Sequence, residues 1–254
     1  MLIILSPSKT ITRIATKAKI NPSQPLLLDR SEPLVDALRK LSQKDIEDLM
    51  SISPQLARLN VERFITWSAP FDTTNSHPAL LSFKGDVYEG INAEDFTYDD
   101  FAFAQNHLRI LSGLYGALRP LDLMQPYRLE MGTKIGIGKS KNLYDYWKTV
   151  LIEYINTDLN GSSKGILVNL ASNEYSKVLD FKAINGKIIT PIFKEQKGNT
   201  YKTLAIHAKR ARGLMTRFII KNKIDNVENL KLFDYEGYYF NLYESKGNDW
   251  VFLR

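Results

Sequence analysis

The chain has 254 residues, of which 44% are hydrophobic and 24% charged, a composition typical of a soluble globular protein with a sizeable core. It contains no cysteine, which excludes disulfides, thiolate catalysis and cysteine-ligated metal centres. No apolar run approaches the roughly 20 residues that span a bilayer, and the opening MLIIL lacks the basic region of a signal peptide. We therefore expect a cytoplasmic protein.

The first third of the chain is expected to contain one strand and several helices. MLIIL reads as a short buried strand followed by the polar turn SPSKT, and residues 11–30 lack periodicity and are expected to be loop. Residues 31–67 have apolar residues at helical spacing, with helix N-caps expected at Ser31, Ser42 and Ser53. The segment ALLSFKGDVYEGI could form a strand and a turn or begin a helix, and the pattern leaves both open.

The middle of the chain is expected to alternate helices with buried strands. TYDDFAFAQNHL predicts a helix capped by Thr97, and LRILSG predicts a strand after it. A longer helix is predicted from the cap Asn142 to near Gly161, and GILVNLAS is the clearest buried strand of the chain.

The last third is expected to be rich in hairpins. KIITPIFKE and TYKTLAIHA predict a hairpin around QKGN, a basic helix follows at about 207–222, and EGYYFNLY and DWVFL predict two terminal strands. No repeat or linker separates these parts. We therefore predict one mixed α/β (α+β) domain, residues 1–254, with a mixed central sheet.

Positive charge is concentrated in the last third. Residues 194–223 contain nine Lys or Arg against one acid, Glu195, a net of +8 where the whole chain carries +6. Such a segment is the expected footprint of a polyanion-binding protein. The alternative is a solvated helix face whose acidic partners come from elsewhere in the fold.

The predicted basic helix is amphipathic. At about 100° per residue its apolar residues fall on one side and its basic residues across the other side or on its flank. Such a helix can lie along a phosphate backbone, which makes binding salt-sensitive without specifying sequence. It could also lie on a membrane surface, but its place between hairpins favours packing on the core. We expect DNA contacts from Lys209, Arg210, Arg212, Arg217 and Lys221.

A glycine turn lies in ILSGLYGALRP. Glycines let backbone N–H groups approach a phosphate closely, and helix-hairpin-helix DNA-binding motifs use a glycine–hydrophobic–glycine turn in this way. Gly113 and Gly116 are one residue further apart than that pattern requires. The two glycines are DNA-contact candidates, with a turn required only by packing as the alternative.

The loop RPLDLMQPYRLEMG supplies further binding candidates. Arg119 and Arg128 have the forked geometry that suits phosphate or carboxylate, and Tyr127 could stack on a base. An internal lattice of Arg–Asp and Arg–Glu pairs that braces the loop is the alternative, and the two interpretations are compatible.

Two polar residues follow predicted strands at the ends where α/β folds bind ligands. Lys9 in SPSKT could hold a phosphate, and Glu174 in NLASNEYSK could act as a general acid or base. A catalytic site shared by these residues and Arg128 requires all three to lie close together. The three histidines are far apart and show no metal-ligand spacing, so we expect no metal site and no cofactor.

Six segments together resemble the YaaA family of bacterial peroxide-stress proteins. They run in order from residue 6 to residue 240: SPSKT, FKGDVYEG, LSGLYGALRPLDLMQPYRLEMG, NLASNEYSK, AKRARGLMTRFII and EGYYF. Two positions depart from the family pattern, with Ser8 in place of an alanine and Asn173 in place of an aspartate. The second departure shifts any role that needs a carboxylate from residue 173 to Glu174.

The resemblance implies a single α/β domain of an unusual fold, with a positively charged cleft and a helix-hairpin-helix-like element. It also implies binding to DNA, both duplex and distorted or unpaired, and a role in limiting free iron and oxidative DNA damage during hydrogen peroxide stress. Without cysteine or clustered metal ligands, direct peroxide reduction and iron storage are disfavoured. An enzyme acting on a nucleobase, nucleotide or damaged DNA is the main alternative, and an iron or small-molecule chaperone is a weaker one.

Overall fold

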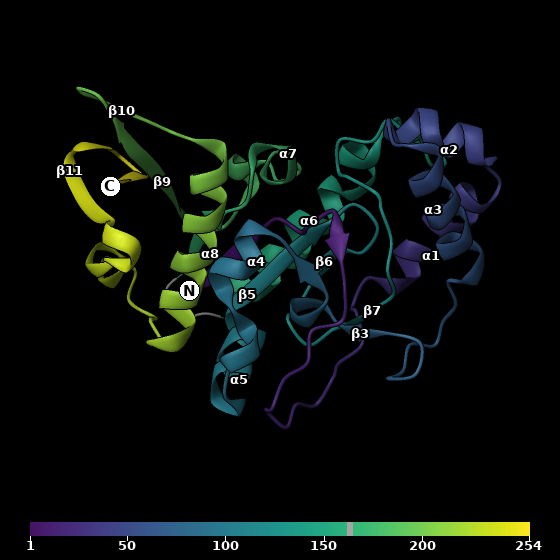
Figure 1. Ribbon diagram of the computed structural model, residues 1–254, viewed down its shortest axis with the longest axis horizontal. Helices are drawn as coiled ribbons and strands as arrows, with labels where there is room; N and C mark the ends of the chain where they lie inside the picture. Colours follow the sequence, from purple (N-terminus) through teal and green to yellow (C-terminus); the bar gives the residue numbers. More distant parts are fainter. Residues whose placement is uncertain (162–164) are drawn as a thin grey trace.

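A mixed sheet runs through the molecule, and short apolar strands form its centre. The computed structural model describes residues 1–161 and 165–254 (Figure 1). The strand order is β11-β12-β9-β8-β1-β5-β6, with β10 paired to β9. Every residue of β1 and β5 is buried, as expected for parallel strands that are covered on both faces. The four central strands of the sheet are β5 (Leu108–Ser112), β1 (Leu2–Leu5), β8 (Ile166–Leu170) and β9 (Lys187–Lys197).

Neighbouring strands are parallel in the middle of this sheet and antiparallel at its margins. β1 pairs in parallel with β5 and β8, and β9 pairs in parallel with β8 and β12. Hairpins add the remaining strands, which are β6 (Gly116–Leu118), β10 (Thr200–Lys202), β11 (Tyr239–Lys246) and β12 (Asp249–Leu253). Short bridges outside this sheet pair β2 (Thr10–Ile11) with β4 (Phe83–Lys84) and β3 (His77–Pro78) with β7 (Leu123–Met124).

The predicted helical region 31–67 contains α1 (Leu28–Arg39), α2 (Gln43–Met50) and α3 (Pro54–Thr66). Ser42 and Ser53 are N-caps as predicted, because their side chains accept hydrogen bonds from backbone N–H groups of the first turn. The prediction for Ser31 is wrong. That residue is buried inside α1, which begins three residues earlier so that its buried stripe can start ahead of Leu34.

The central helices confirm the other predicted caps. Thr97 forms a capping box at α5 (Tyr98–His107), and Asn142 caps α6 (Leu143–Asn160). The ambiguous segment ALLSFKGDVYEGI contains both of its alternatives, the strand β4 and the helix α4 (Asp86–Ile91). The remaining helical turns are η1 (Ala79–Leu81), η2 (Ala93–Asp95), α7 (Asn173–Ser176), η3 (Phe181–Ala183), η4 (Val227–Leu232) and η5 (Tyr235–Gly237).

The basic helix is α8 (Ala205–Lys221), which starts two residues before the predicted position. Its apolar side, including Ala211, Met215 and Phe218, is buried as predicted. It packs closely on α4 because both helices present a glycine at the contact, Gly90 and Gly213. A side chain added at either position would overlap the backbone of the other helix.

The glycine turn at 113–116 does not belong to a helix-hairpin-helix element. It connects the antiparallel strands β5 and β6, and Gly116 has a φ of +68°, which glycine adopts without strain. A Cβ at Gly113 would overlap the Leu129 carbonyl, and one at Gly116 would lie 2.6 Å from the ring of Trp147. The packing alternative therefore accounts for both glycines.

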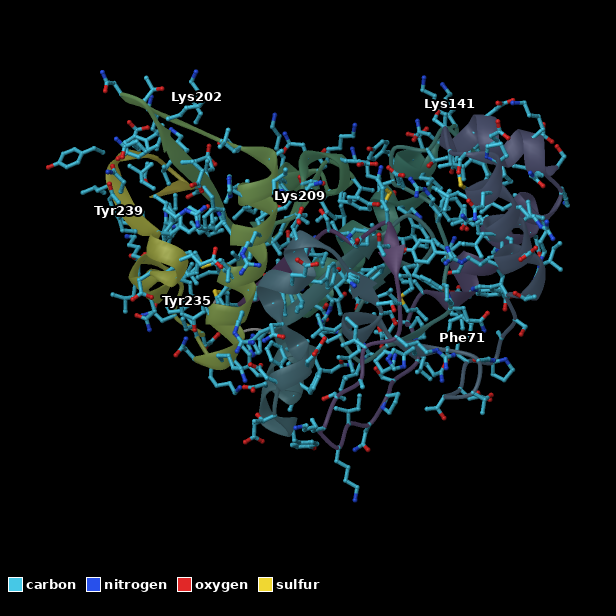
Figure 2. The ribbon with its side chains drawn as sticks, in the orientation of Figure 1. Phe71, Lys141, Lys202, Lys209, Tyr235 and Tyr239 are labelled. Carbon is cyan, nitrogen blue, oxygen red and sulfur yellow. The ribbon has the colours of Figure 1, made fainter. Side chains whose placement is uncertain are left out.

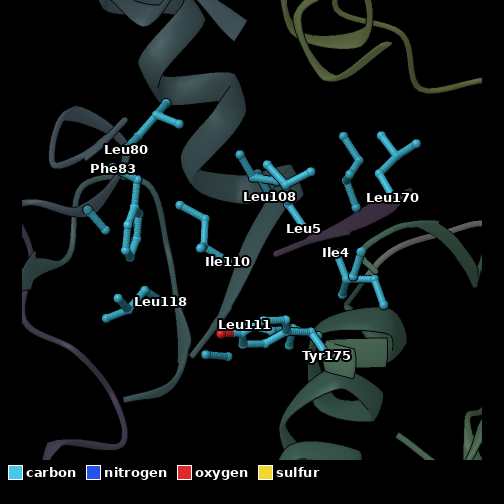
Figure 3. Close-up of a cluster of buried hydrophobic side chains, with 14 of the residues drawn as sticks. Ile4, Leu5, Leu80, Phe83, Leu108, Ile110, Leu111, Leu118, Leu170 and Tyr175 are labelled. Atoms are coloured by element: carbon cyan, nitrogen blue, oxygen red, sulfur yellow. The ribbon is translucent and has the colours of Figure 1, made fainter. Parts of the chain in front are cut away.

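One hydrophobic core joins most of these elements. It extends from the N-terminal strand to the C-terminal strand β12, and Figure 3 shows part of it around Ile4, Leu5, Leu108 and Leu170. The predicted fold class, a mixed α/β domain with a mixed central sheet, is confirmed. None of the helices in the described ranges has both the length and the apolar character needed to cross a membrane.

Candidate functional site

A cavity of about 280 Å³ lies at the carboxyl ends of β1 and β8. After β1 the chain crosses to β5 on one side, whereas after β8 it continues to β9 on the other side. The loops that follow β1 and β8 therefore diverge, and α/β sheets commonly bind ligands at such a point. The cavity is lined by residues 6–9, residues 85–88, Leu170, Ser172, Glu174, Tyr175, Lys209 and Arg212. Four segments that sequence analysis singles out separately meet here: SPSKT, FKGDVY, NLASNEYSK and the basic helix.

Hydrogen bonds between the two strand-end loops hold the floor of the cavity. Ser6 Oγ accepts from the backbone N–H of Ser172 at 2.8 Å and lies 3.1 Å from Ser172 Oγ. The Tyr88 hydroxyl donates to the carbonyl of Ser6 at 3.0 Å. Burial, followed by the nearby Tyr127 and Tyr175, raises the pKa of the Tyr88 phenol well above its usual value. The tyrosine therefore stays neutral and serves as a fixed donor.

Two basic residues of α8 line this cavity without an ion-pair partner among the described residues, and the carboxylates of Asp86 and Glu174 line it as well. Lys209 is exposed and Arg212 is half-buried, and both line the cavity. Neither side chain forms an ion pair or a hydrogen bond within the part of the chain that the structure describes. Burial lowers the pKa of the Arg212 guanidinium, but arginine stays charged in proteins. Lys9, Lys209 and Arg212 against Asp86 and Glu174 give the cavity lining one net positive charge (three minus two), and Arg212 is partly desolvated.

The other three predicted DNA contacts of α8 face carboxylates. Arg210 contacts Glu236, with Nε to Oε1 at 2.8 Å. Arg217 Nη2 lies 2.6 Å from Asp95 Oδ2, and Lys221 Nζ lies 2.9 Å from Asp100 Oδ2. These contacts match the alternative in which acidic partners come from elsewhere in the fold, and DNA binding by Arg210, Arg217 and Lys221 stays a prediction.

The three residues considered for catalysis share one neighbourhood. Lys9 and Glu174 both line the cavity. Lys9 Nζ lies 2.7 Å from Glu130 Oε2, and Arg128 Nη2 lies 3.3 Å from Glu130 Oε1. Glu174 Oε1 accepts from the backbone N–H of Gly132, in the same loop, at 3.2 Å. Lys9 and Glu174 therefore share one cavity, Arg128 is connected to Lys9 through Glu130, and a shared catalytic site stays a prediction.

Arg128 has one further feature. Its Nε is buried and has no hydrogen-bond partner among the described residues. Its only carboxylate partner there, Glu130, is shared with Lys9. At Glu130 two cations, Lys9 and Arg128, therefore share one carboxylate.

Arg119 and Tyr127 have protein partners. The Arg119 guanidinium lies 2.7 Å from the buried Asp122 and also donates to the carbonyl of Gln24. Tyr127 is buried, its hydroxyl lies 2.6 Å from Ser112 Oγ, and burial raises its pKa. Tyr127 and the buried glycines Gly113 and Gly116 would meet DNA only if this region opened, whereas Arg119 is partly exposed; for all four, a role in binding stays a prediction.

Sequence analysis does not single out Ser6 and Ser172, although both are central to the cavity. Ser6 directly follows β1 and Ser172 comes two residues after β8, and a position at the end of a buried strand is the signal that could identify them. Two of the histidines contact backbone carbonyl oxygens: His77 contacts that of Ile14, and His107 contacts that of Met1. In the described ranges no group of three or more His, Asp or Glu is arranged to hold a metal ion.

Comparison with known proteins agrees with the motifs. A sequence model described as "Peroxide stress protein YaaA" matches residues 1–243. A UPF0246 protein of Saccharophagus degradans is 50% identical over 254 residues, covering 100% of this chain and 99% of the relative. A UPF0246 protein of Colwellia psychrerythraea is 49% identical with the same coverage.

Proposed function

Because this chain belongs to the peroxide stress protein YaaA family, we propose that it acts in the peroxide-stress response by binding DNA, above all duplex that is distorted or unpaired. The observation that carries the proposal is that Lys209 and Arg212 line the cavity and form no ion pair among the described residues. Protection of the bound DNA from oxidative damage, together with a lower level of free iron, is the cellular outcome that we propose.

A phosphate suits the charge of the cavity. A half-buried guanidinium that forms no ion pair is unfavourable in the free protein, and an anionic ligand would supply a direct partner. Arg212 can hold two phosphate oxygens with its fork of donors, and Lys209 adds a point charge at the rim. The hydroxyls of Ser6 and Ser172 line the same space and can complete the hydrogen bonding.

The dimensions of the cavity favour an unpaired nucleotide. Its volume of about 280 Å³ is near the lower end for small-ligand sites and too small for a stacked duplex. A base that has left the stack can enter such a space. Val87, Leu170 and the rings of Tyr88 and Tyr175 supply apolar walls for it, while the phosphate stays with Lys209 and Arg212.

The experiment compares two sets of substitutions on the same helix. Anisotropy of a labelled duplex with an unpaired segment, and of the fully paired duplex, is measured over a range of salt concentrations. We expect Lys209→Ala with Arg212→Ala to weaken binding to the unpaired segment by about tenfold or more and to reduce its salt dependence. The matched control Arg210→Ala, whose partner is Glu236, retains binding. Equal affinity of the double variant and the unchanged protein contradicts the proposal.

A specific observation also supports the enzyme alternative. Glu174 and Lys9 line the same cavity, and Glu130 connects Lys9 to Arg128. In this arrangement Glu174 would transfer protons at a bound base or nucleotide while Lys9 and Arg128 hold its phosphate. Mass spectrometry of nucleotides and of bubble-containing DNA after incubation tests it. A product that Glu174→Gln does not form supports an enzyme, and unchanged substrate masses contradict one.

A further inference from the structure

The cavity contains a carboxylate that the proposed function leaves without a role. Asp86, the first residue of α4, lines the cavity and is half-buried. Its side chain forms no hydrogen bond and no ion pair with the described residues. The pKa of Arg210 is raised first by its hydrogen bond to Glu236 and only in smaller part by the charge of Asp86. Both carboxylate oxygens of Asp86 are therefore available to a ligand.

Aspartates at other helix starts show the usual structural use of such a residue. Asp45, Asp100 and Asp145 lie in the first turns of α2, α5 and α6. Each accepts a hydrogen bond from a backbone N–H group just before its helix. Asp86 also lies in a first turn, but its side chain makes no such bond. Helix capping therefore does not account for it.

The backbone fixes the position of Asp86. The carbonyl of Lys84 accepts a hydrogen bond from Ser8 Oγ at the end of β4. Gly85 follows with a φ of +127°, which favours glycine, and a Cβ there would lie 3.3 Å from Ser8 Oγ. Figure 2 shows Lys209 on the upper part of α8, the helix on which α4 packs through the two glycines described above. The carboxylate and the two basic residues at the cavity therefore come from two helices that are held together.

A carboxylate with two available oxygens discriminates between nucleobases. An ionised aspartate only accepts hydrogen bonds, so it favours a base edge with two adjacent donors. Guanine presents N1–H beside its N2 amino group on its Watson–Crick edge. Adenine and cytosine present an amino group beside a ring nitrogen that is itself an acceptor, and thymine has one N–H between two carbonyl oxygens. Guanine is therefore the DNA base whose edge matches the carboxylate of Asp86.

Glu174 is the other carboxylate of the cavity, and it is already engaged. Its Oε1 accepts a hydrogen bond from the backbone N–H of Gly132 at 3.2 Å. A bidentate contact from Glu174 to a base would compete with this bond. Asp86 has no such bond to lose, so it is the better partner for two donors.

We propose that Asp86 makes the cavity selective for guanine, with its carboxylate accepting from N1–H and the N2 amino group of an unpaired guanine. The phosphate of that nucleotide lies at Lys209 and Arg212. This inference rests on the proposed function, because it requires an unpaired nucleotide in this cavity. It adds the base that is preferred and the residue that selects it.

The test depends on two effects of opposite sign. Asp86→Asn removes a negative charge beside a phosphate site, which by itself strengthens the binding of any DNA. It also places an amide N–H₂ against a donor of guanine, which weakens the binding of guanine alone. We therefore expect affinity to fall for guanine and to stay equal or rise for the other bases.

The measurement is the anisotropy of labelled duplexes that differ only in one unpaired nucleotide, with the full-length protein. The unchanged protein is expected to prefer unpaired guanine over the other three bases by about tenfold. In Asp86→Asn this preference should fall to about twofold or less. Retained binding of the other bases shows that the variant is folded.

Matched controls separate the carboxylate from its charge. Glu89 is exposed on the same helix and is not among the residues that line the cavity, so Glu89→Gln removes the same charge and should keep the guanine preference. Hypoxanthine, which lacks the N2 amino group, should lose most of the preference. 7-Deazaguanine, which keeps the Watson–Crick edge, should retain it.

Each remaining outcome has one meaning. A guanine preference that survives in Asp86→Asn overturns the role of Asp86, and its loss in Glu174→Gln would then assign it to the other carboxylate. Equal affinity of the unchanged protein for all four bases overturns the selectivity and leaves the proposed function intact. Absence of binding to any of these duplexes overturns both.

Discussion

On helix α8, Arg210, Arg217 and Lys221 face carboxylates, whereas Lys209 and Arg212 face a cavity. The first three contact acids on other elements, namely Asp95, Asp100 and Glu236. The last two have no acidic partner in the part of the chain that the structure describes. All five residues lie within 13 positions of one helix, so the difference is created by what the fold brings to each side of α8.

The comparison separates two uses of the same residue types. A basic residue with a fixed carboxylate partner contributes to the folded state and has lost much of its capacity to attract a ligand. A desolvated one without a partner weakens the folded state and is available to an anion. A concentrated basic segment therefore does not by itself locate a binding surface.

The largest effect on stability is expected when the ion pairs of Arg217 and Lys221 are removed. Arg217→Ala with Lys221→Ala removes both cations at Asp95, one of the two at Asp100, and the donor to the carbonyls of Ile91 and Asn92. We expect the free energy of unfolding to fall by about 3 kcal/mol, measured by chemical denaturation, with DNA affinity close to that of the unchanged protein. Lost DNA affinity with unchanged stability would show that these residues bind DNA after all.

The second-largest effect on stability is expected at Gly213, where α8 packs on α4 beside the cavity. In Gly213→Ala the new methyl group would overlap the carbonyl of Val87, so we expect a loss of about 2 kcal/mol in unfolding free energy. DNA binding should weaken as well, because Asp86 and Val87 at the start of α4 line the cavity. Gly161→Ala is the control, since the nearest atoms lie at 3.6 Å, and it should have little effect on either quantity.

Acid should weaken the ion pairs that Asp100 forms with Lys221 and Lys223. Burial opposes ionisation of Asp100, but hydrogen bonds from Lys223, the Thr97 backbone and Lys221 together hold the pKa of its carboxyl far below the usual value. A lowered folded-state pKa stabilises the protein above the unfolded value of about 4, and this contribution is lost as the pH falls below it. We expect a loss of the order of 1 kcal/mol between pH 5 and 3, measured by denaturation at each pH. Asp100→Asn should be less stable at pH 7 and should show a flatter pH profile; an equally steep profile would assign the effect to other acids.

The fold could largely be predicted because its signals are local. MLIIL and GILVNLAS are continuous apolar runs, and strands buried on both faces require such runs. Ser42, Ser53, Thr97 and Asn142 precede helices and accept from their first turns. The turn at 113–116 could not be assigned from spacing, because whether two glycines join helices or strands depends on the partners that pack on them, here Leu129 and Trp147.

The candidate site could be predicted only in part, because some of its properties depend on contacts between residues that are distant in the sequence. Lys9 and Glu174 follow predicted strands, and that rule places them at the cavity. The division of α8 into paired and unpaired residues depends on acids far away in the sequence, since Arg217 and Asp95 are 122 positions apart. Helical periodicity identifies the basic side of α8, but it contains no information on which carboxylates reach that side.

At Arg212, which forms no ion pair within the described part of the chain, we expect a substitution to change the stability in the opposite direction. Arg212→Met replaces a desolvated, unpartnered guanidinium by an apolar side chain of similar length. We expect the unfolding free energy to rise by about 1 kcal/mol while DNA affinity falls. Arg210→Met, at the residue that already has Glu236 as its partner, is the matched control and should not gain stability. A less stable Arg212→Met variant would mean that the guanidinium contributes to the folded state.

The smallest effect is expected at Arg210 itself, and it distinguishes a shared carboxylate from a single pair. The side chains of Arg210 and Glu236 are 42% and 33% exposed, and ion pairs at such positions contribute about 0–1 kcal/mol. Glu236 also keeps a second cation, because Arg254 Nη1 lies 3.3 Å from its other oxygen. Arg210→Ala should therefore lower the unfolding free energy by about 0.5 kcal/mol or less. The same substitution made together with Arg254→Ala should cost more than the sum of the two single changes, since only then does the carboxylate lose every cation. Strict additivity in this double-mutant cycle would show that the two arginines act on Glu236 independently.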